Sequence, residues 1–269
     1  MMDTWQKIWR VVSGVISVAS FGYLVYRLAI FDWGTLTSAG LGGLSEGGMS
    51  AGGMNEGGRW WFIGIATLVF PVPVLIEARR WQVMMQGLSN LSFRESLRQV
   101  LTGLQAGFIT PYRVGEYPAR VAEAGAKADV QWGNWRVWLR DWRKWLQVIG
   151  ITALKYIIWG SQLWCVLWAC GIELGFVDAV SAIAVYYFCI SVFPSVPIAD
   201  IGVKGGWALL IFGEYGGTAP QLTAVVSIIW GINTILPLLW GYIVACRGGI
   251  DRRADAQRSQ PNREVRSER

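Results

Sequence analysis

Apolar segments of about twenty residues recur along this chain and restrict the folds that are open to it. The clearest are residues 11–31, 60–76, 146–170, 179–193 and 221–246. A helix rises about 1.5 Å per residue, so segments of this length reach across the hydrocarbon core of a bilayer. Hydrophobic residues make up 53% of the chain and charged residues 16%, against roughly 25% charged in a soluble domain. We therefore predict an all-α, polytopic membrane bundle.

The charged residues lie mainly between and after these segments, and their signs alternate. Basic residues precede the first segment, separate the second from the third and crowd the tail at 247–269, whereas the other connections are mainly acidic. Because Lys and Arg concentrate in cytoplasmic loops, both termini are predicted to be cytoplasmic, with about six crossings and one re-entrant or broken helix. Residues 1–246 then form one transmembrane domain. The tail has no apolar periodicity, and we predict that it is disordered and cytoplasmic.

Two further stretches within this domain have a special composition. Residues 34–58 repeat a glycine-rich unit (GGLSE, GGMSA, GGMNE), which we interpret as a flexible loop because it has no apolar surface to bury. Residues 131–145 (QWGNWRVWLRDWRKW) place Trp side chains on one helical face and Arg and Lys on the other. Arg interleaved with aromatic residues also occurs in proteins that bind single-stranded nucleic acid. The position between membrane segments favours an interfacial helix, and we expect no nucleic-acid partner.

The residue types present exclude several kinds of catalytic site. The chain has no His, which excludes His-based nucleophile triads and His metal sites. Its four Cys lie in apolar stretches without CxxC spacing, so the sequence predicts neither a disulfide framework nor a metal site. No paired-carboxylate motif is present either. We expect no enzyme activity, no metal and no other cofactor.

The stretch Gly103–Arg120 (GLQAGFITPYRVGEYPAR) carries both signs of charge between apolar segments. A helix is predicted to stop at Thr110–Pro111, and Arg113, Glu116 and Arg120 follow within a short distance. Ions and unpaired backbone groups are costly in a membrane. We therefore interpret this broken helix as a polar site rather than as a spacer.

Two further places bring charge into apolar surroundings. A second break, at Pro194 and Pro197, precedes Asp200 and Lys204, whose spacing of four residues lets them pair on one helical turn. Lys155 lies inside the segment 146–170. Its side chain either extends along the helix to the basic end, as long cationic side chains do near a membrane surface, or belongs to the polar site.

Three short motifs follow one another between residues 60 and 242. They are Glu77, Ala78, Arg80 and Trp81; then Gly107, Thr110, Pro111, Arg113, Gly115, Glu116 and Arg120; then Pro194, Pro197, Gly202, Val203, Lys204 and Gly205. Together they resemble the pattern of the lysylphosphatidylglycerol synthase transmembrane-region family, often called flippase-like. The resemblance implies a protein of the bacterial inner membrane that moves a polar-headed glyco- or phospholipid across the bilayer. No synthase domain follows residue 246, so lipid aminoacylation is not expected.

The resemblance and the charges together predict a site for a lipid headgroup, anionic or phosphate-bearing. Its candidate residues are Arg113, Glu116, Arg120, Asp200, Lys204, Glu77, Arg80 and Lys155. Arg and Lys side chains would hold a phosphate, and the carboxylates would orient them or take an amino headgroup. The alternative is that these residues form internal ion pairs that fix two broken helices. The region between the second motif and Lys155 is shorter than in relatives, which keeps a second function open: a non-transporting scaffold or accessory subunit of a lipid or envelope pathway.

Overall fold

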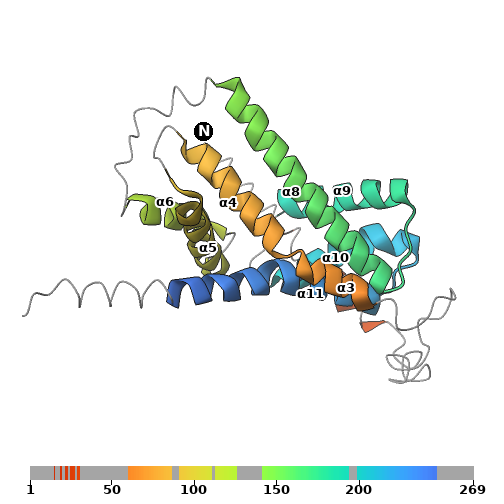
Figure 1. Ribbon diagram of the computed structural model, residues 1–269. Coiled ribbons are helices and arrows are strands. Elements are labelled where there is room, and N and C mark those ends of the chain that lie inside the picture. The colour runs from red at the N-terminus through yellow and green to blue at the C-terminus, as the bar shows by residue number, and fades with distance from the viewer. Residues whose placement is uncertain are drawn as a thin grey trace, which may run out of the picture.

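The computed structural model describes residues 60–86, 91–110, 113–125, 141–193 and 199–246, together with isolated positions between 15 and 30. Every regular element in these ranges is a helix, which confirms the all-α class. In chain order they are α3 (Trp60–Leu68), α4 (Pro71–Met85), α5 (Phe93–Ile109), α6 (Glu116–Gly125), α8 (Trp142–Ala169), α9 (Phe176–Val192), α10 (Asp200–Phe212), η5 (Gly213–Tyr215), α11 (Ala219–Trp230) and the π-helical turn η6 (Gly231–Ile235) (Figure 1).

Two helical segments of the described residues are long and apolar enough to cross a membrane. One is Trp60–Met85, which joins α3 to α4, and the other is Ala219–Cys246, which contains α11 and η6. The apolar helix α9 has only 17 residues. A bundle of about six crossings therefore stays a prediction. The predicted first segment (apart from the isolated positions), the loop at 34–58, most of the amphipathic stretch (131–140) and the tail at 247–269 lie outside the described residues.

The helix pair α3–α4 runs antiparallel to α8 along most of its length (Figure 1). Contacts at three levels fix this arrangement: Lys144 reaches the carbonyl of Gln86 at 3.5 Å, Lys155 reaches Glu77 at 2.8 Å, and Gln162 reaches Ala66 at 3.0 Å. Residue numbers rise on α8 as they fall on α3–α4, which is the order expected for antiparallel helices. The first turn of α8 includes Trp142 and Trp145. The last residues of the amphipathic helix that was predicted at 131–145 therefore belong to α8.

The helix Trp60–Met85 is interrupted at Val69–Phe70, directly before Pro71 and Pro73. Proline has no N–H group to donate and cannot continue the hydrogen-bond ladder. The N–H of Phe70 bonds the carbonyl of Thr67 at 3.1 Å, so the Ala66 carbonyl loses its usual intrahelical partner. The side-chain amide of Gln162 donates to this carbonyl at 3.0 Å, and Gln162 is buried. The interruption is therefore stabilised by α8.

We expect Gln162→Leu to lower the free energy of unfolding by about 1–3 kcal/mol, because the Ala66 carbonyl is then buried without a donor. Thermal unfolding in detergent, followed by circular dichroism, measures this loss. The neighbouring Ser161→Ala is the control, since Ser161 is exposed and its hydroxyl bonds only the Ile157 carbonyl of its own helix. Equal unfolding temperatures for the two variants would contradict the role of Gln162.

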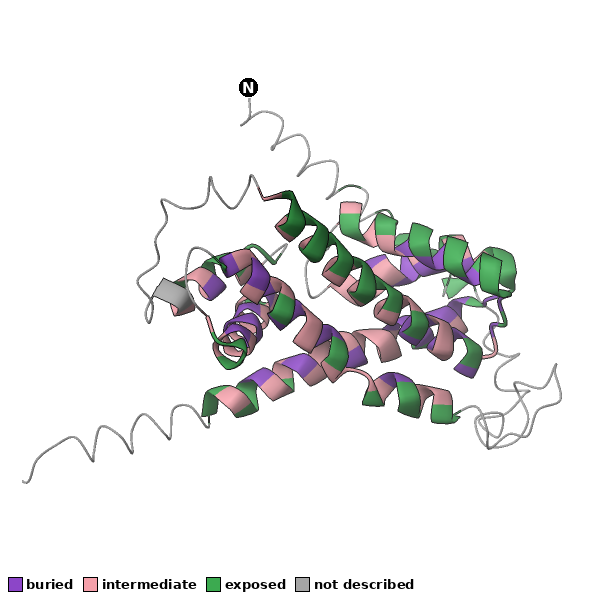
Figure 2. Cartoon of the chain, turned by 45° about the horizontal axis from the view of Figure 1, so that its top comes forward, coloured by how far each residue is buried: buried purple, intermediate pink, exposed green. Residues whose placement is uncertain are grey.

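Buried side chains gather in two apolar clusters. The larger lies between α8, α9, α10 and α11, with Leu163, Val166, Leu222 and Val225 among its fully buried members. The smaller joins α4 to α5 around Trp81, whose indole N–H donates to Gln99 at 2.6 Å. Figure 2 shows buried residues on the sides where helices face one another and exposed residues on the outward sides. The polar residues described next lie beside the smaller cluster.

Candidate functional site

Glu77 is the centre of a group of ion pairs inside the bundle. Its Oε1 lies 2.6 Å from Nη2 of Arg80 and 2.9 Å from Nη1 of Arg120, and its Oε2 lies 2.8 Å from Nζ of Lys155. These partners come from α4, α6 and α8. The Glu77 side chain is only 7% exposed. One buried carboxylate therefore holds three cations from three helices.

Glu116, at the start of α6, is the second carboxylate. It pairs with Arg120 on one side and, through Oε2, with Nε of Arg113 at 3.2 Å on the other. The side chain of Arg120 is 1% exposed, whereas that of Arg113 is 57% exposed. Arg120 thus joins the two carboxylates from inside, and Arg113 lies at the outer edge. We call the set Glu77, Arg80, Arg113, Glu116, Arg120 and Lys155 the Glu77 cluster.

The turn that presents Arg113 and Glu116 is built by short-range contacts. Helix α5 ends at Ile109, and the Thr110 hydroxyl donates to the Ala106 carbonyl at 2.8 Å while accepting from the N–H of Gly115 at 2.9 Å. Arg113 has a φ of 56°, in the left-handed region that side chains other than glycine and asparagine rarely adopt. This strained conformation is held by the turn and places the Arg113 side chain beside Glu116.

Helix α6 folds back along α5 because two glycines on α5 remove the side chains that would block it. A Cβ atom at Gly103 would lie 2.6 Å from Cγ of Arg120 and 2.9 Å from the backbone oxygen of Glu116. At Gly107, four residues later, it would lie 3.1 Å from Cβ of Glu116. Gly103 and Gly107 therefore leave the space that Glu116 and Arg120 occupy.

Aromatic rings cover the cations where carboxylates do not. The Arg120 guanidinium carbon lies 5.4 Å from the ring centroids of both Trp81 and Tyr117, and Nζ of Lys155 lies 4.3 Å from that of Trp159. Such cation–π contacts stabilise cations that have little water around them. The Nε atoms of Arg80 and Arg120 are buried without a hydrogen-bond partner. The guanidinium groups therefore keep donor capacity that the carboxylates do not use.

No match to this chain was found among protein-family models, curated proteins or solved structures. The family resemblance therefore stays a prediction, and the chemistry of the cluster has to be inferred from its own contacts. The cluster contains four cations and two carboxylates, an excess of two positive charges. Such an excess in a poorly hydrated place attracts an anion.

The structure brings together six of the eight residues that the sequence suggested for the site. Lys155 does not extend to the helix end; its side chain is 14% exposed and contacts Glu77. Arg80 also contacts Glu77, and its helix continues to Met85. Asp200 and Lys204 pair with each other at 2.6 Å on α10, as their spacing predicted. These two residues form a separate pair.

Sequence reasoning missed the residues that position the cluster. Gly103, Tyr117, Gln99 and Trp159 were not singled out for it. The spacing of four residues between Lys155 and Trp159 is a signal that the two side chains share one helical face. The bond from Trp81 to Gln99 has no such local signal, because the two residues are 18 positions apart.

Proposed function

We propose that this chain is a membrane protein that binds the phosphate-bearing headgroup of a lipid at the Glu77 cluster and carries it across the bilayer. The observation that supports this most strongly is the excess of two positive charges in a largely buried group of six ionised side chains. Ionisable residues are rare within membrane segments and usually mark a substrate or ion pathway there.

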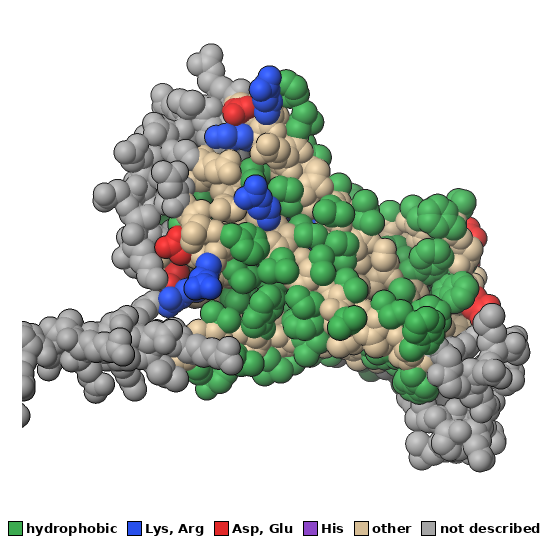
Figure 3. All heavy atoms as spheres, in the orientation of Figure 1, with side chains coloured by type: hydrophobic (Ala, Val, Ile, Leu, Met, Phe, Trp, Pro, Cys, Tyr) green, Lys and Arg blue, Asp and Glu red, His purple; other side chains and the backbone are tan. Residues whose placement is uncertain are grey.

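The outer surface of the bundle supports a membrane location. Large apolar side chains are exposed on several helices, including Leu68 (80%), Ile149 (59%) and Phe176 (69%). Soluble monomers rarely expose apolar surface so widely. Figure 3 shows apolar side chains over the middle and right of one face, Lys and Arg with some acidic residues beside them towards its left and upper left, and only acidic residues at its right edge. This distribution suits a bundle whose cationic end faces the cytoplasm.

Exposure divides the cluster into ligands and positioning residues. Arg113 is the most exposed member, and Arg80 and Lys155 keep 19% and 14% of their side chains exposed. A guanidinium group matches the geometry of a phosphate with two parallel hydrogen bonds. We assign headgroup binding to Arg113, Arg80 and Lys155. Arg120 is fully buried and acts with the two carboxylates to hold these three cations in place.

Interruptions in the helices support movement of the bound headgroup. The chain leaves regular α-helix at Val69–Phe70, between Ile109 and Glu116, and at the π-helical turn Gly231–Ile235. Transporters use interrupted helices to place polar groups within the membrane. A phosphate that competes with Glu77 for Lys155 weakens a contact between α4 and α8. Binding and helix movement are coupled through that contact.

The test is lipid transfer in vesicles that contain the purified protein and fluorescent phosphatidylglycerol, with dithionite bleaching as the readout. We expect the protein to accelerate bleaching of the inner leaflet, and Arg113→Gln to slow it about tenfold, the loss expected for a charge-assisted hydrogen bond. Arg79→Gln is the matched control, because Arg79 is exposed and bonds Gln82 at 2.5 Å outside the cluster. Unchanged transfer in Arg113→Gln would contradict the assigned site.

A non-transporting scaffold is the second candidate function. It is favoured by the fact that every cation of the Glu77 cluster already contacts a carboxylate, which suffices to fix the helices. Parent protein that leaves the inner leaflet unbleached, although it is folded and inserted, would support the scaffold.

A further inference from the structure

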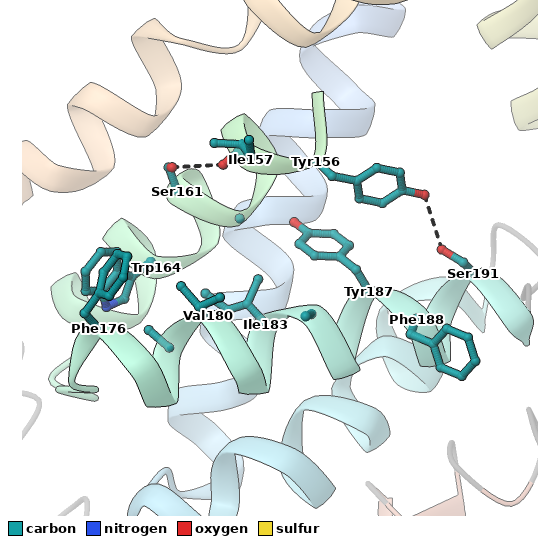
Figure 4. A pocket seen from close by; sticks show the side chains of 13 residues that line it. Tyr156, Ile157, Ser161, Trp164, Phe176, Val180, Ile183, Tyr187, Phe188 and Ser191 are labelled. Carbon is teal, nitrogen blue, oxygen red and sulfur yellow. Dashed lines mark hydrogen bonds between the residues drawn. The ribbon is translucent and has the colours of Figure 1, made fainter. Parts of the chain in front are cut away.

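A groove of about 670 Å³ runs between α8 and α9. Its walls include Tyr156, Gly160 and Trp164 of α8 and Val180, Ile183 and Tyr187 of α9 (Figure 4). We call it the α8–α9 groove. The two helices approach closely at its floor, where a Cβ atom on Gly160 would lie 3.4 Å from Ile183. Its volume lies within the range of about 300–1,000 Å³ that is usual for ligand pockets.

Polar groups are not spread evenly along the groove. The Ser161 hydroxyl bonds the Ile157 carbonyl at 2.9 Å, and the Tyr187 hydroxyl bonds the Trp159 carbonyl at 3.0 Å, so both are used within the protein. At one end, the Tyr156 hydroxyl and the Ser191 hydroxyl lie 3.5 Å apart and are exposed (Figure 4). The groove is therefore apolar along its length and polar at one end, which matches an amphiphile.

The polar end of the groove lies next to the Glu77 cluster along α8. Tyr156 directly follows Lys155, whose Nζ contacts both Glu77 and the ring of Trp159. The Trp159 ring in turn stacks on Tyr187 of the groove, with centroids 6.2 Å apart. The cluster has an excess of positive charge and can attract an anionic headgroup. The acyl chain of a lipid whose headgroup lies near Lys155 would then begin at the polar end of the groove.

We infer that the α8–α9 groove holds one acyl chain of a phospholipid whose phosphate binds near Lys155. This inference rests on the proposed function, since it takes the headgroup site from there. It adds that the protein recognises an acyl chain of the lipid as well as its headgroup. The apolar walls, the single polar end and the adjacent positive charge together match a phospholipid.

The test uses phosphatidylglycerol with a photoreactive diazirine in one acyl chain, mixed into vesicles that contain the full-length protein. After illumination, mass spectrometry locates the labelled peptides. We expect labelling to concentrate on residues 156–164 and 176–191. Ala184→Phe, which places a ring in the groove, should reduce that labelling several-fold. Val185→Phe is the matched control, because Val185 is exposed on the same helix but does not line the groove.

The inference is overturned if the groove stays unlabelled, and two other results would also overturn it. Labelling that is equally strong on α3 and α9 would show ordinary boundary lipid, and cross-links between two protein chains through the groove would assign it to a second copy. The failure of this inference differs from failure of the proposed function. An unlabelled groove with transfer that depends on Arg113 removes only the chain site. A labelled groove that Ala184→Phe blocks, with normal transfer in Arg113→Gln, supports the chain site and contradicts the headgroup site.

Discussion

Glu77→Gln is expected to destabilise the protein by about 3–5 kcal/mol, the loss typical when one partner of a buried ion pair is removed. Glu77 contacts Arg80, Arg120 and Lys155, and its side chain is 7% exposed. Its loss leaves Glu116 as the one carboxylate of the cluster beside four cations. The amide of Gln does not replace the carboxylate, because its NH₂ group is a hydrogen-bond donor and would face Arg and Lys groups that are also donors.

Chemical unfolding in mixed micelles, followed by circular dichroism, measures this effect. Glu123→Gln is the control, since Glu123 pairs with Arg98 at 3.2 Å where both side chains are about a quarter exposed, and should change stability by less than about 1 kcal/mol. A second variant, Glu77→Gln with Lys155→Met, should recover part of the loss because one uncompensated cation is removed. Parent-like stability of Glu77→Gln alone would show that the cluster is not held by this carboxylate.

Gly103→Ala is expected to lower the free energy of unfolding by about 1–3 kcal/mol and, under the proposed function, to impair lipid transfer, although it adds only one methyl group. That methyl would lie 2.6 Å from Cγ of Arg120 and 2.9 Å from the backbone oxygen of Glu116. Because one of these atoms belongs to the backbone, rotation of a side chain cannot relieve the overlap. Helix α6 must move away from α5 and take Glu116 and Arg120 with it.

The same unfolding and transfer assays test this prediction. Gly64→Ala is the matched control, because Gly64 lies in α3 with no atom within 4 Å of the added Cβ. In a helix, this control should be neutral or stabilising by about 0.5–1 kcal/mol. If both alanine variants behave alike, close approach of α6 to Gly103 does not matter for stability.

The sequence predicted the features that depend on neighbouring residues. Proline accounts for the end of α5 before Pro111, since it cannot donate to a helix ladder. The pair Asp200–Lys204 follows from a spacing of four residues. These features need no knowledge of how distant segments pack.

The composition of the cluster was harder to predict, because its central contacts join distant segments. Glu77 and Lys155 are 78 residues apart, and no local rule relates them. The sequence suggested one site that draws on both broken stretches. The structure joins the first stretch to α4 and α8 and gives Lys204 a partner on its own helix. Which cations share a carboxylate is decided by helix packing.

The three-way contact at Glu77 has a consequence for the positions of the helices along their own axes. In a membrane, burying apolar side chains between helices adds no hydrophobic driving force, because the lipid tails around them are equally apolar, so polar contacts between helices matter more. A shift of α8 by one residue, about 1.5 Å along its axis, would pull the ammonium group of Lys155 away from its carboxylate. The ion pairs therefore fix the positions of α4, α6 and α8 relative to one another along their axes.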